Sequence, residues 1–301
     1  METSTHQFAV RGHEYHPIGE TAQSLPAGFY SADYGIDGPY FERKEVETRD
    51  LLRFEDSAGD LIISETELFW KLAEKYEAMG EAHKRGYLLY GPPGSGKTCI
   101  TAFLMHDFIA QGNLVFEYDN ALPELITALR QVPAEKDRKI MILLEDLDNW
   151  MSGGNAEHKL LQFLDGSIQH KNTLIVATTN YPEELAERII NRPSRFDRVM
   201  EIGMPSSKMR LEYIKAKSIK MRTEAEMQVL VEDSEGFSIA HLKELLIALD
   251  IFGGDYNEIL FRLKGGLAQK IEQEATGRED YPHLDPDEDI DEPEERTRCQ
   301  R

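Results

Sequence analysis

The sequence predicts an α/β fold, a parallel sheet flanked by helices, followed by a small all-helical unit. Between residues 87 and 180, apolar runs of strand length alternate with segments whose apolar residues recur at helical spacing. This alternation is typical of a parallel sheet, whose chemistry lies at the carboxyl ends of the strands. Beyond Pro205 only helical patterns remain, at 206–218, 224–231, 239–252 and 256–274. A glycine-rich loop between the first strand and the first helix is the third observation.

This loop has the sequence Gly91-Pro92-Pro93-Gly94-Ser95-Gly96-Lys97-Thr98 and fits G-x-x-x-x-G-K-[ST], the P-loop pattern. A chance Gly/Pro turn is the alternative, but an apolar run precedes the loop and a helical pattern follows it. Its glycines allow successive N–H groups to converge on phosphates at a helix N-terminus. Lys97 then reaches the β- and γ-phosphates, and the Thr98 hydroxyl is a ligand for Mg²⁺. All eight residues are candidates for binding ATP, the expected cofactor together with Mg²⁺.

A pair of carboxylates ends the apolar strand 140–144, at Glu145 and Asp146. In phosphoryl-transfer sites one such carboxylate holds Mg²⁺ or its water shell, and its neighbour polarises the attacking water. The alternative is an acidic pair that merely ends a buried strand. We expect Asp148, two residues on, to be solvated or to cap a helix.

Two further candidates follow later in the chain. Asn180 lies at the tip of the strand 173–178, where it could orient the attacking water or sense the γ-phosphate; ordinary turn chemistry is the alternative. Arg192, Arg195 and Arg198 are spaced three residues apart. A guanidinium can spread transition-state charge, often from a neighbouring subunit, although surface ion pairing is common for arginine.

Taken in order, these motifs resemble the AAA ATPases. The P-loop, the acidic strand tip, Ala-Thr-Thr-Asn at 177–180 and Arg-Pro-Ser-Arg-Phe-Asp-Arg at 192–198 follow the family's order, and 235–242 resembles its lid segment. The resemblance covers about residues 61–272 and implies a P-loop NTPase core with a helical lid. It also implies a homo-oligomeric ring, hexameric or heptameric, that acts on a protein partner. Within this family Lys97 and Thr98 contact nucleotide and Mg²⁺, Asn180 is a sensor, and Arg192 and Arg195 are candidate arginine fingers, of which we favour Arg195.

Three segments look most like the branch that contains the mitochondrial inner-membrane ATPase that translocates the folded Rieske protein: 84–90, 143–146 and 161–166.

Three features depart from what the family or this branch implies. The strand tip reads Glu-Asp where the family has Asp-Glu, an inversion that the branch shares. By alignment Glu145 takes the metal-associated position and Asp146 the water-activating one, but the exchanged side-chain lengths leave these roles open. The segment between Tyr118 and Ile140 has no aromatic-Gly pore motif, and the sequence shows no transmembrane run. No His-Glu-x-x-His follows the lid.

Four units are expected on this basis: an N-terminal extension (1–60), the large α/β nucleotide-binding subdomain (61–204), a helical lid (205–274) and an acidic, disordered tail (275–301). The extension is either a partly ordered arm or a segment that packs on the core or on a neighbour. Alternation from Val46 to Phe54 suggests a strand or two. Ser64 and Glu67 have capping-box spacing, which predicts that a helix begins there.

Composition limits the class of partner and the compartment. The net charge is −21, and from Glu272 onward twelve acidic and four basic residues contribute −8 of it, so −13 remains on the body. An acidic body argues against a broad basic surface for nucleic acid. Two cysteines, Cys99 and Cys299, provide no disulfide framework, and no apolar run approaches the ~18 residues of a membrane span. We therefore expect a cytoplasmic protein without membrane insertion.

The function expected first is hydrolysis of Mg-ATP by a ring that remodels or translocates a protein partner. The alternative is a nucleotide-dependent scaffold or switch with slow hydrolysis, which the inverted carboxylates motivate. A nucleic-acid motor or loader is compatible with the fold but disfavoured by the charge balance.

Overall fold

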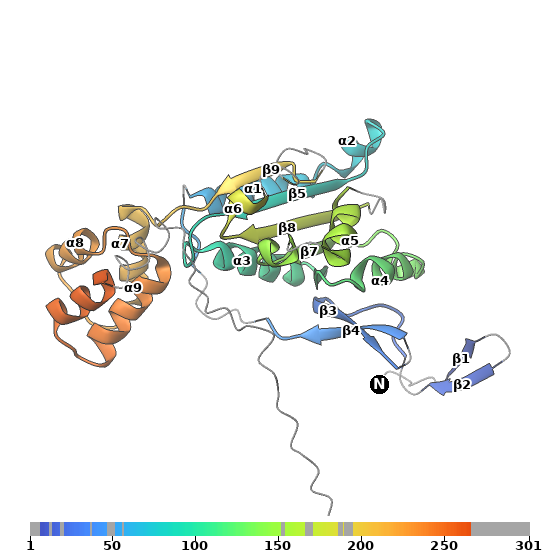
Figure 1. Cartoon of the computed structure of the whole chain (residues 1–301), viewed down its shortest axis with the longest axis horizontal. Coiled ribbons are helices and arrows are strands. Elements are labelled where there is room, and N and C mark those ends of the chain that lie inside the picture. The colour runs from blue at the N-terminus through green and yellow to red at the C-terminus, as the bar shows by residue number, and fades with distance from the viewer. Residues whose placement is uncertain are drawn as a thin grey trace, which may run out of the picture.

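The computed structural model describes residues 7–11, 14–18, 21–36, 38–46, 52–55, 57–151, 154–165, 171–185, 189 and 195–265. A seven-stranded sheet is flanked by helices on both faces, and a helical unit lies beside it (Figure 1). The strand order is β4-β3-β6-β7-β8-β5-β9, and every neighbouring pair is parallel except β3 and β4. The predicted α/β fold class is confirmed.

The strands of this sheet are β3 (Gly28–Gly35), β4 (Gly38–Lys44), β5 (Lys84–Tyr90), β6 (Leu114–Glu117), β7 (Ile140–Leu144), β8 (Thr173–Thr179) and β9 (Arg198–Glu201). A separate antiparallel pair is formed by β1 (Gln7–Arg11) and β2 (Glu14–Ile18). The helices of the large unit are α1 (Ala58–Phe69), α2 (Ala73–Ala78), α3 (Lys97–Ala110), α4 (Leu122–Leu129), α5 (Asn155–Leu164) and α6 (Pro182–Leu185). Short 3₁₀ turns lie at Pro133–Glu135 and Leu147–Met151.

The core consists of two apolar layers, one on each face of the sheet. All five residues of β7 are buried: Ile140, Ile142 and Leu144 belong to the layer under α4 and α5, and Met141 and Leu143 to the layer under α1 and α3. Side chains of a strand alternate between its two faces, so an uninterrupted apolar run is what a central parallel strand requires. The same reasoning identified this strand from the sequence.

The N-terminal extension contributes to the core sheet. β3 pairs in parallel with β6, and β4 closes the edge in antiparallel pairing. The Tyr30 side chain is 3% exposed, and the Phe41 and Phe116 rings lie 5.0 Å apart beside it. Of the two alternatives for the extension, packing on the core is the one that the structure supports for residues 28–44. The strand expected around 46–54 is not formed at 52–54; its remaining central residues lie outside the described part of the chain.

The predicted helix start at Ser64 is wrong. α1 begins about two turns earlier, where the Ser57 hydroxyl accepts the Asp60 N–H at 3.1 Å, and Ser64 lies inside the helix. The buried residues of α1 extend back to Ile62 and Ile63, so the apolar stripe reaches N-terminal to the supposed cap. Helix ends follow the stripe and its first available cap, and here Ser57 is that cap.

The C-terminal unit is helical, as predicted. It contains α7 (Ser207–Lys217), α8 (Glu224–Asp233), α9 (Ile239–Leu246) with a π turn at Ile247–Ile251, and a helix that is described through residues 256–265. The α7, α8 and α9 helices begin at side-chain caps provided by Ser206, Thr223 and Ser238. The predicted acidic tail, 275–301, lies outside the described residues. Within the described helices, none is both long and apolar enough to cross a bilayer.

Replacing Tyr30 with Ala should lower the free energy of unfolding by about 3 kcal/mol, because the ring fills the space between β3 and β6. The Tyr40→Ala control removes a tyrosine from the same hairpin whose side chain is 45% exposed, and should change the stability little. Urea titration followed by circular dichroism measures both. Equal stability of the two variants would show that residues 28–44 are an accessory arm.

Candidate active site

The strand order brings three predicted motifs to one edge of the sheet. β8 lies between β5 and β7, with Leu89 paired to Thr178 and Leu144 to Ala177. Because parallel strands end at the same edge, the P-loop after β5, Asn180 after β8 and the carboxylates after β7 converge there. This convergence positions the site.

The P-loop, residues 91–98, has the backbone geometry that its glycines predict. Gly91 has φ +150°, and a Cβ atom there would lie 2.2 Å from the Ile202 carbonyl oxygen. Gly96 has φ +111° and is the residue from which α3 starts. L-residues rarely adopt these conformations, so the glycines are required by the turn and by the close approach of the backbone.

Lys97 lies at the centre of the loop and contacts oxygens from two of the motifs. Its Nζ atom donates to the Gly91 carbonyl at 2.6 Å, the Pro92 carbonyl at 3.1 Å and Asn180 Oδ1 at 2.7 Å. Burial lowers the pKa of Lys97, and the nearby Asp146 and Asp148 carboxylates oppose that change. The predicted sensor Asn180 is therefore within hydrogen-bond distance of the P-loop lysine.

The residues present fit a nucleotide phosphate and Mg²⁺. Ser95 Oγ is buried and has no hydrogen-bond partner in the described structure, although buried hydroxyls normally find one. The α3 N-terminus, the Lys97 ammonium and the exposed Thr98 face the same side as the acidic turn. Mg²⁺ needs only one or two hard oxygen ligands from the protein when phosphates and water complete its coordination shell. No cluster of three or more His, Cys, Asp or Glu side chains suited to a metal occurs among the described residues.

The acidic turn, residues 145–148, has an unusual backbone. Asp146 has φ +48°, a left-handed conformation that is uncommon for residues other than glycine, and its N–H donates to Thr178 Oγ1 at 3.2 Å. Thr101 Oγ1 donates to Glu145 Oε1 at 3.3 Å. Desolvation raises the pKa of Glu145, and the hydrogen bond from Thr101 opposes that rise. Backbone strain of this kind is concentrated at functional sites.

The prediction that Asp148 is solvated or caps a helix is wrong. Its Oδ1 atom accepts the Thr179 hydroxyl at 2.7 Å, which connects the acidic turn to the end of β8. The Thr179 hydroxyl also accepts the Tyr181 N–H at 3.0 Å. No local sequence pattern indicates this link, because the two residues lie 31 positions apart and meet only through the strand order.

The three arginines differ in their surroundings. The Arg195 side chain is 4% exposed and donates twice to Asp165, from Nε at 2.7 Å and from Nη2 at 2.8 Å. Arg198 donates to Glu65 at 2.7 Å on the surface. Arg192 lies outside the described residues. A bidentate ion pair within the chain fixes Arg195 at the end of α5. Arg195 can therefore act as an arginine finger only if this pair opens, or if the paired guanidinium faces a neighbouring subunit.

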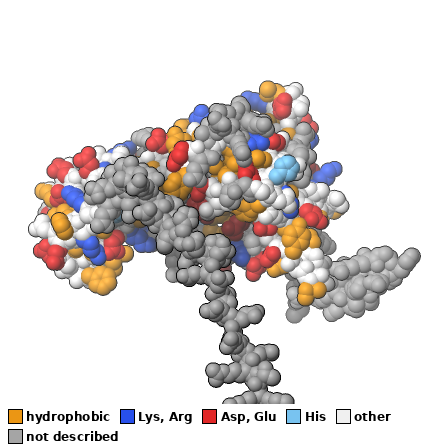
Figure 2. Space-filling model, in the orientation of Figure 1, with side chains coloured by type: hydrophobic (Ala, Val, Ile, Leu, Met, Phe, Trp, Pro, Cys, Tyr) orange, Lys and Arg blue, Asp and Glu red, His pale blue; other side chains and the backbone are white. Residues whose placement is uncertain are grey.

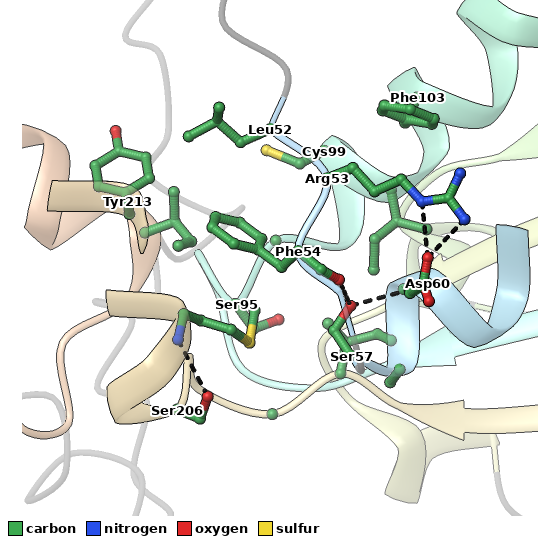
Figure 3. Close-up of a pocket in the computed structure, with 18 of the residues that line it drawn as sticks. Leu52, Arg53, Phe54, Ser57, Asp60, Ser95, Cys99, Phe103, Ser206 and Tyr213 are labelled. Atoms are coloured by element: carbon green, nitrogen blue, oxygen red, sulfur yellow. Dashed lines mark hydrogen bonds and ion pairs between the residues drawn. The ribbon is translucent and has the colours of Figure 1, made fainter. Parts of the chain in front are cut away.

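A cavity of about 290 Å³ adjoins the P-loop between the large unit and the lid (Figure 3). Leu52 and Phe54 pack on the lid core near Tyr213, whereas Arg53 pairs with Asp60 on α1. Further lining comes from the P-loop, from α3 and from the segment that leads into α7. The apolar, enclosed character of this cavity suits a nucleobase, and its position suits one whose phosphates lie on the P-loop.

A second cavity, of about 370 Å³, lies over the phosphate side and shares Gly96, Cys99 and Ile239 with the first. The lid closes it: the Ile239 N–H donates to the Gly94 carbonyl at 3.2 Å. Lys243 of α9 also lines it, is exposed, and forms no ion pair with the residues that the structure describes. On the face shown in Figure 2, basic side chains are scattered among acidic ones.

Sequence reasoning missed four residues of this site: Thr101, Thr178, Thr179 and Lys243. Thr101 lies one helical turn after Thr98, so the spacing alone predicts that both lie on the same face of α3. The two threonines that end β8 precede Asn180 directly. Lys243 had no local signal, since only the docking of the lid places it beside the P-loop.

The fold and the site define a P-loop α/β nucleotide-binding protein with a helical lid. Residues 87–204 match the family described as "ATPase family associated with various cellular activities (AAA)", so this part of the chain is similar to AAA ATPase domains. The resemblance in the motifs is thus confirmed at the level of the family domain.

Two kinds of curated relative match part of the chain. The chain is 31% identical over 205 residues to the proteasome-activating nucleotidase of Thermococcus onnurineus, which covers 62% of this chain and 51% of that protein. It is 31% identical over 219 residues to the ATP-dependent zinc metalloprotease FtsH of Mycoplasma mobile, covering 65% and 31%. The chain thus spans about half the length of the nucleotidases that it matches, and less of the metalloprotease.

Replacing Asn180 with Ala should reduce kcat for ATP by roughly 100-fold, because an oriented polar group beside the reacting phosphate is lost. Affinity for ATP should change much less, since the P-loop amides and Lys97 remain. Steady-state kinetics together with equilibrium binding of a fluorescent ATP analogue separate the two effects. An equal loss of both would make Asn180 a residue of the binding surface rather than a sensor.

Proposed function

We propose that the chain is a Mg-ATP hydrolase whose active site is formed by residues 91–98, Glu145, Asp146 and Asn180. The observation that carries this proposal is the contact of Lys97 with Asn180 at an edge of the sheet where the acidic turn also ends. P-loop lysine, acidic turn and polar sensor are the parts that phosphoryl transfer from ATP uses.

Each part has a distinct task in this proposal. The N–H groups of the P-loop and the N-terminus of α3 bind the phosphate oxygens, and Lys97 exchanges a carbonyl partner for the γ-phosphate. Thr98 and Glu145 would hold Mg²⁺, which when bound neutralises charge on the β- and γ-phosphates. Asp146 accepts a proton from the attacking water, and Asn180 orients that water. The base lies in the cavity between the large unit and the lid.

The lid is positioned to respond to the nucleotide. Its helix α9 touches the P-loop through Ile239 and Gly94, and the segment 52–54 contacts both the lid and the large unit. Loss of the γ-phosphate would change the contacts on one side of this junction only, and rigid-body rotation of a packed unit is the usual result.

We further propose that the protein acts on another protein, as a homo-oligomeric ring. The names of the relatives connect nucleotide use with the proteasome and with a metalloprotease, which supports a protein partner. The units expected at 1–60, 61–204 and 205–274, the likeness to the Rieske-translocating branch, and a cytoplasmic location stay predictions. A slow nucleotide-dependent switch is the second candidate, favoured by the inverted Glu145-Asp146 pair.

Turnover of ATP per protomer should rise with protein concentration and then reach a plateau, because a neighbouring subunit completes the site. Replacing Lys97 with Ala should abolish turnover and weaken nucleotide binding at least about 100-fold. Phosphate release measured across a protein dilution series tests both. A Lys97→Ala protein with unchanged turnover would refute the hydrolase, and constant low turnover of the unmodified protein would favour the switch.

If Arg195 acts in the neighbour's site, mixed oligomers should recover activity. A subunit with Arg195→Ala keeps its own phosphate site, and a subunit with Lys97→Ala keeps its arginine, so each pair contains one complete site. Each variant alone should be nearly inactive, and a mixture should regain a fraction of turnover. Asp165→Asn serves as the control for the intrachain pair: if it reproduces the Arg195→Ala defect and mixing restores nothing, Arg195 is structural.

A further inference from the structure

Two buried threonine hydroxyls hold the acidic turn, and they come from different elements. Thr101 of α3 is fully buried, and its Oγ1 lies 3.3 Å from Glu145 Oε1 and 3.0 Å from the Thr98 carbonyl. Thr178 of β8 is 3% exposed, and its Oγ1 accepts the Asp146 N–H at 3.2 Å. Each hydroxyl therefore contacts a different one of the two acidic residues.

Thr101 connects Glu145 to the P-loop. A threonine hydroxyl has one hydrogen, and here two acceptors lie within its reach. An ionised carboxylate is the stronger acceptor, so the hydrogen is directed to Glu145 when that residue is charged. Thr101 lies one turn after Thr98 on the same helix, so this contact connects the Glu145 carboxylate to the first turns of the helix that begins at the P-loop.

Thr178 fixes a different feature, the backbone of Asp146. The left-handed conformation at this residue persists only if its surroundings support it. The Thr178 hydroxyl satisfies the Asp146 N–H, and the neighbouring Thr179 anchors Asp148 two residues on. Asp146 lines the phosphate cavity together with Lys97 and Asn180.

We propose that Thr101 and Thr178 are positioning residues with separate tasks. Thr101 places Glu145 for Mg²⁺, and Thr178 places Asp146 for the attacking water. The proposal rests on the proposed function and gives a structural reason for the two roles assigned there: Glu145 belongs to the metal side and Asp146 to the γ-phosphate side.

Valine replaces threonine with nearly the same shape and removes only the hydroxyl. We would compare Thr101→Val and Thr178→Val with Thr66→Val, a matched control in α1 whose hydroxyl is buried and lies outside the site. The first readout is the dissociation constant of a fluorescent ADP analogue with and without Mg²⁺, and the second is kcat for ATP. Melting temperatures establish that each variant is folded.

Mg²⁺ should increase nucleotide affinity about 10-fold less in Thr101→Val than in the unmodified protein. This is the scale of effect typical of residues that orient metal ligands. Thr178→Val should keep that gain and lose about 10-fold or more in kcat. Thr101→Ser and Thr178→Ser, which retain the hydroxyl, should restore each property. If a valine variant does not fold, the alanine variant takes its place.

Two outcomes would overturn the proposal. In the first, Thr101→Val and Thr178→Val match Thr66→Val in both nucleotide affinity and kcat. In the second, both variants lose the Mg²⁺-dependent gain in affinity and kcat together. Lys97→Ala in the same binding assay tests the proposed function separately. If Lys97→Ala still binds the nucleotide normally, the proposed function fails. If it does not bind while Thr101→Val behaves as the unmodified protein, only the positioning role fails.

Discussion

Strand β8, between β7 and β5, is the element on which the candidate active site depends. All seven of its residues are buried, and it pairs on both sides, with β5 and with β7. The three polar residues at its end each contact a different partner: Thr178 the Asp146 amide, Thr179 the Asp148 carboxylate, and Asn180 the Lys97 ammonium. A strand fixed this firmly provides a rigid reference for groups that must lie within a fraction of an ångström of a phosphate.

The same arrangement supports the two acidic residues separately, at the Glu145 side chain and at the Asp146 backbone. The chain turns at Asp146 through a left-handed conformation, so the direction of each side chain is set by the backbone and its hydroxyl partners. A longer Glu145 is held back by Thr101, and a shorter Asp146 is presented by the turn itself. Residue type alone therefore says little about which carboxylate faces the metal.

Much of this could be predicted from the sequence, and the misses have a common cause. The P-loop, the strand tips and Asn180 are local patterns in which a few adjacent residues determine the geometry. Thr179 with Asp148, Arg195 with Asp165, and Lys243 with the P-loop are pairs distant in sequence, so no window of the chain contains both members. The helix start was misplaced for a different reason: Ser64 and Glu67 have capping-box spacing, but the buried Ile62 and Ile63 extend the helix back to a cap at Ser57.

The segment 52–54 gives the nucleotide cavity a mechanical property. Leu52 and Phe54 are inserted among the lid's apolar side chains, while the residue between them, Arg53, is bound to Asp60 and lies over the Phe103 ring of α3. Three consecutive residues thus contact both the lid and the large unit. Movement of the lid away from the large unit would therefore have to separate Leu52 and Phe54 from the lid, or the Arg53 side chain from Asp60 and Phe103.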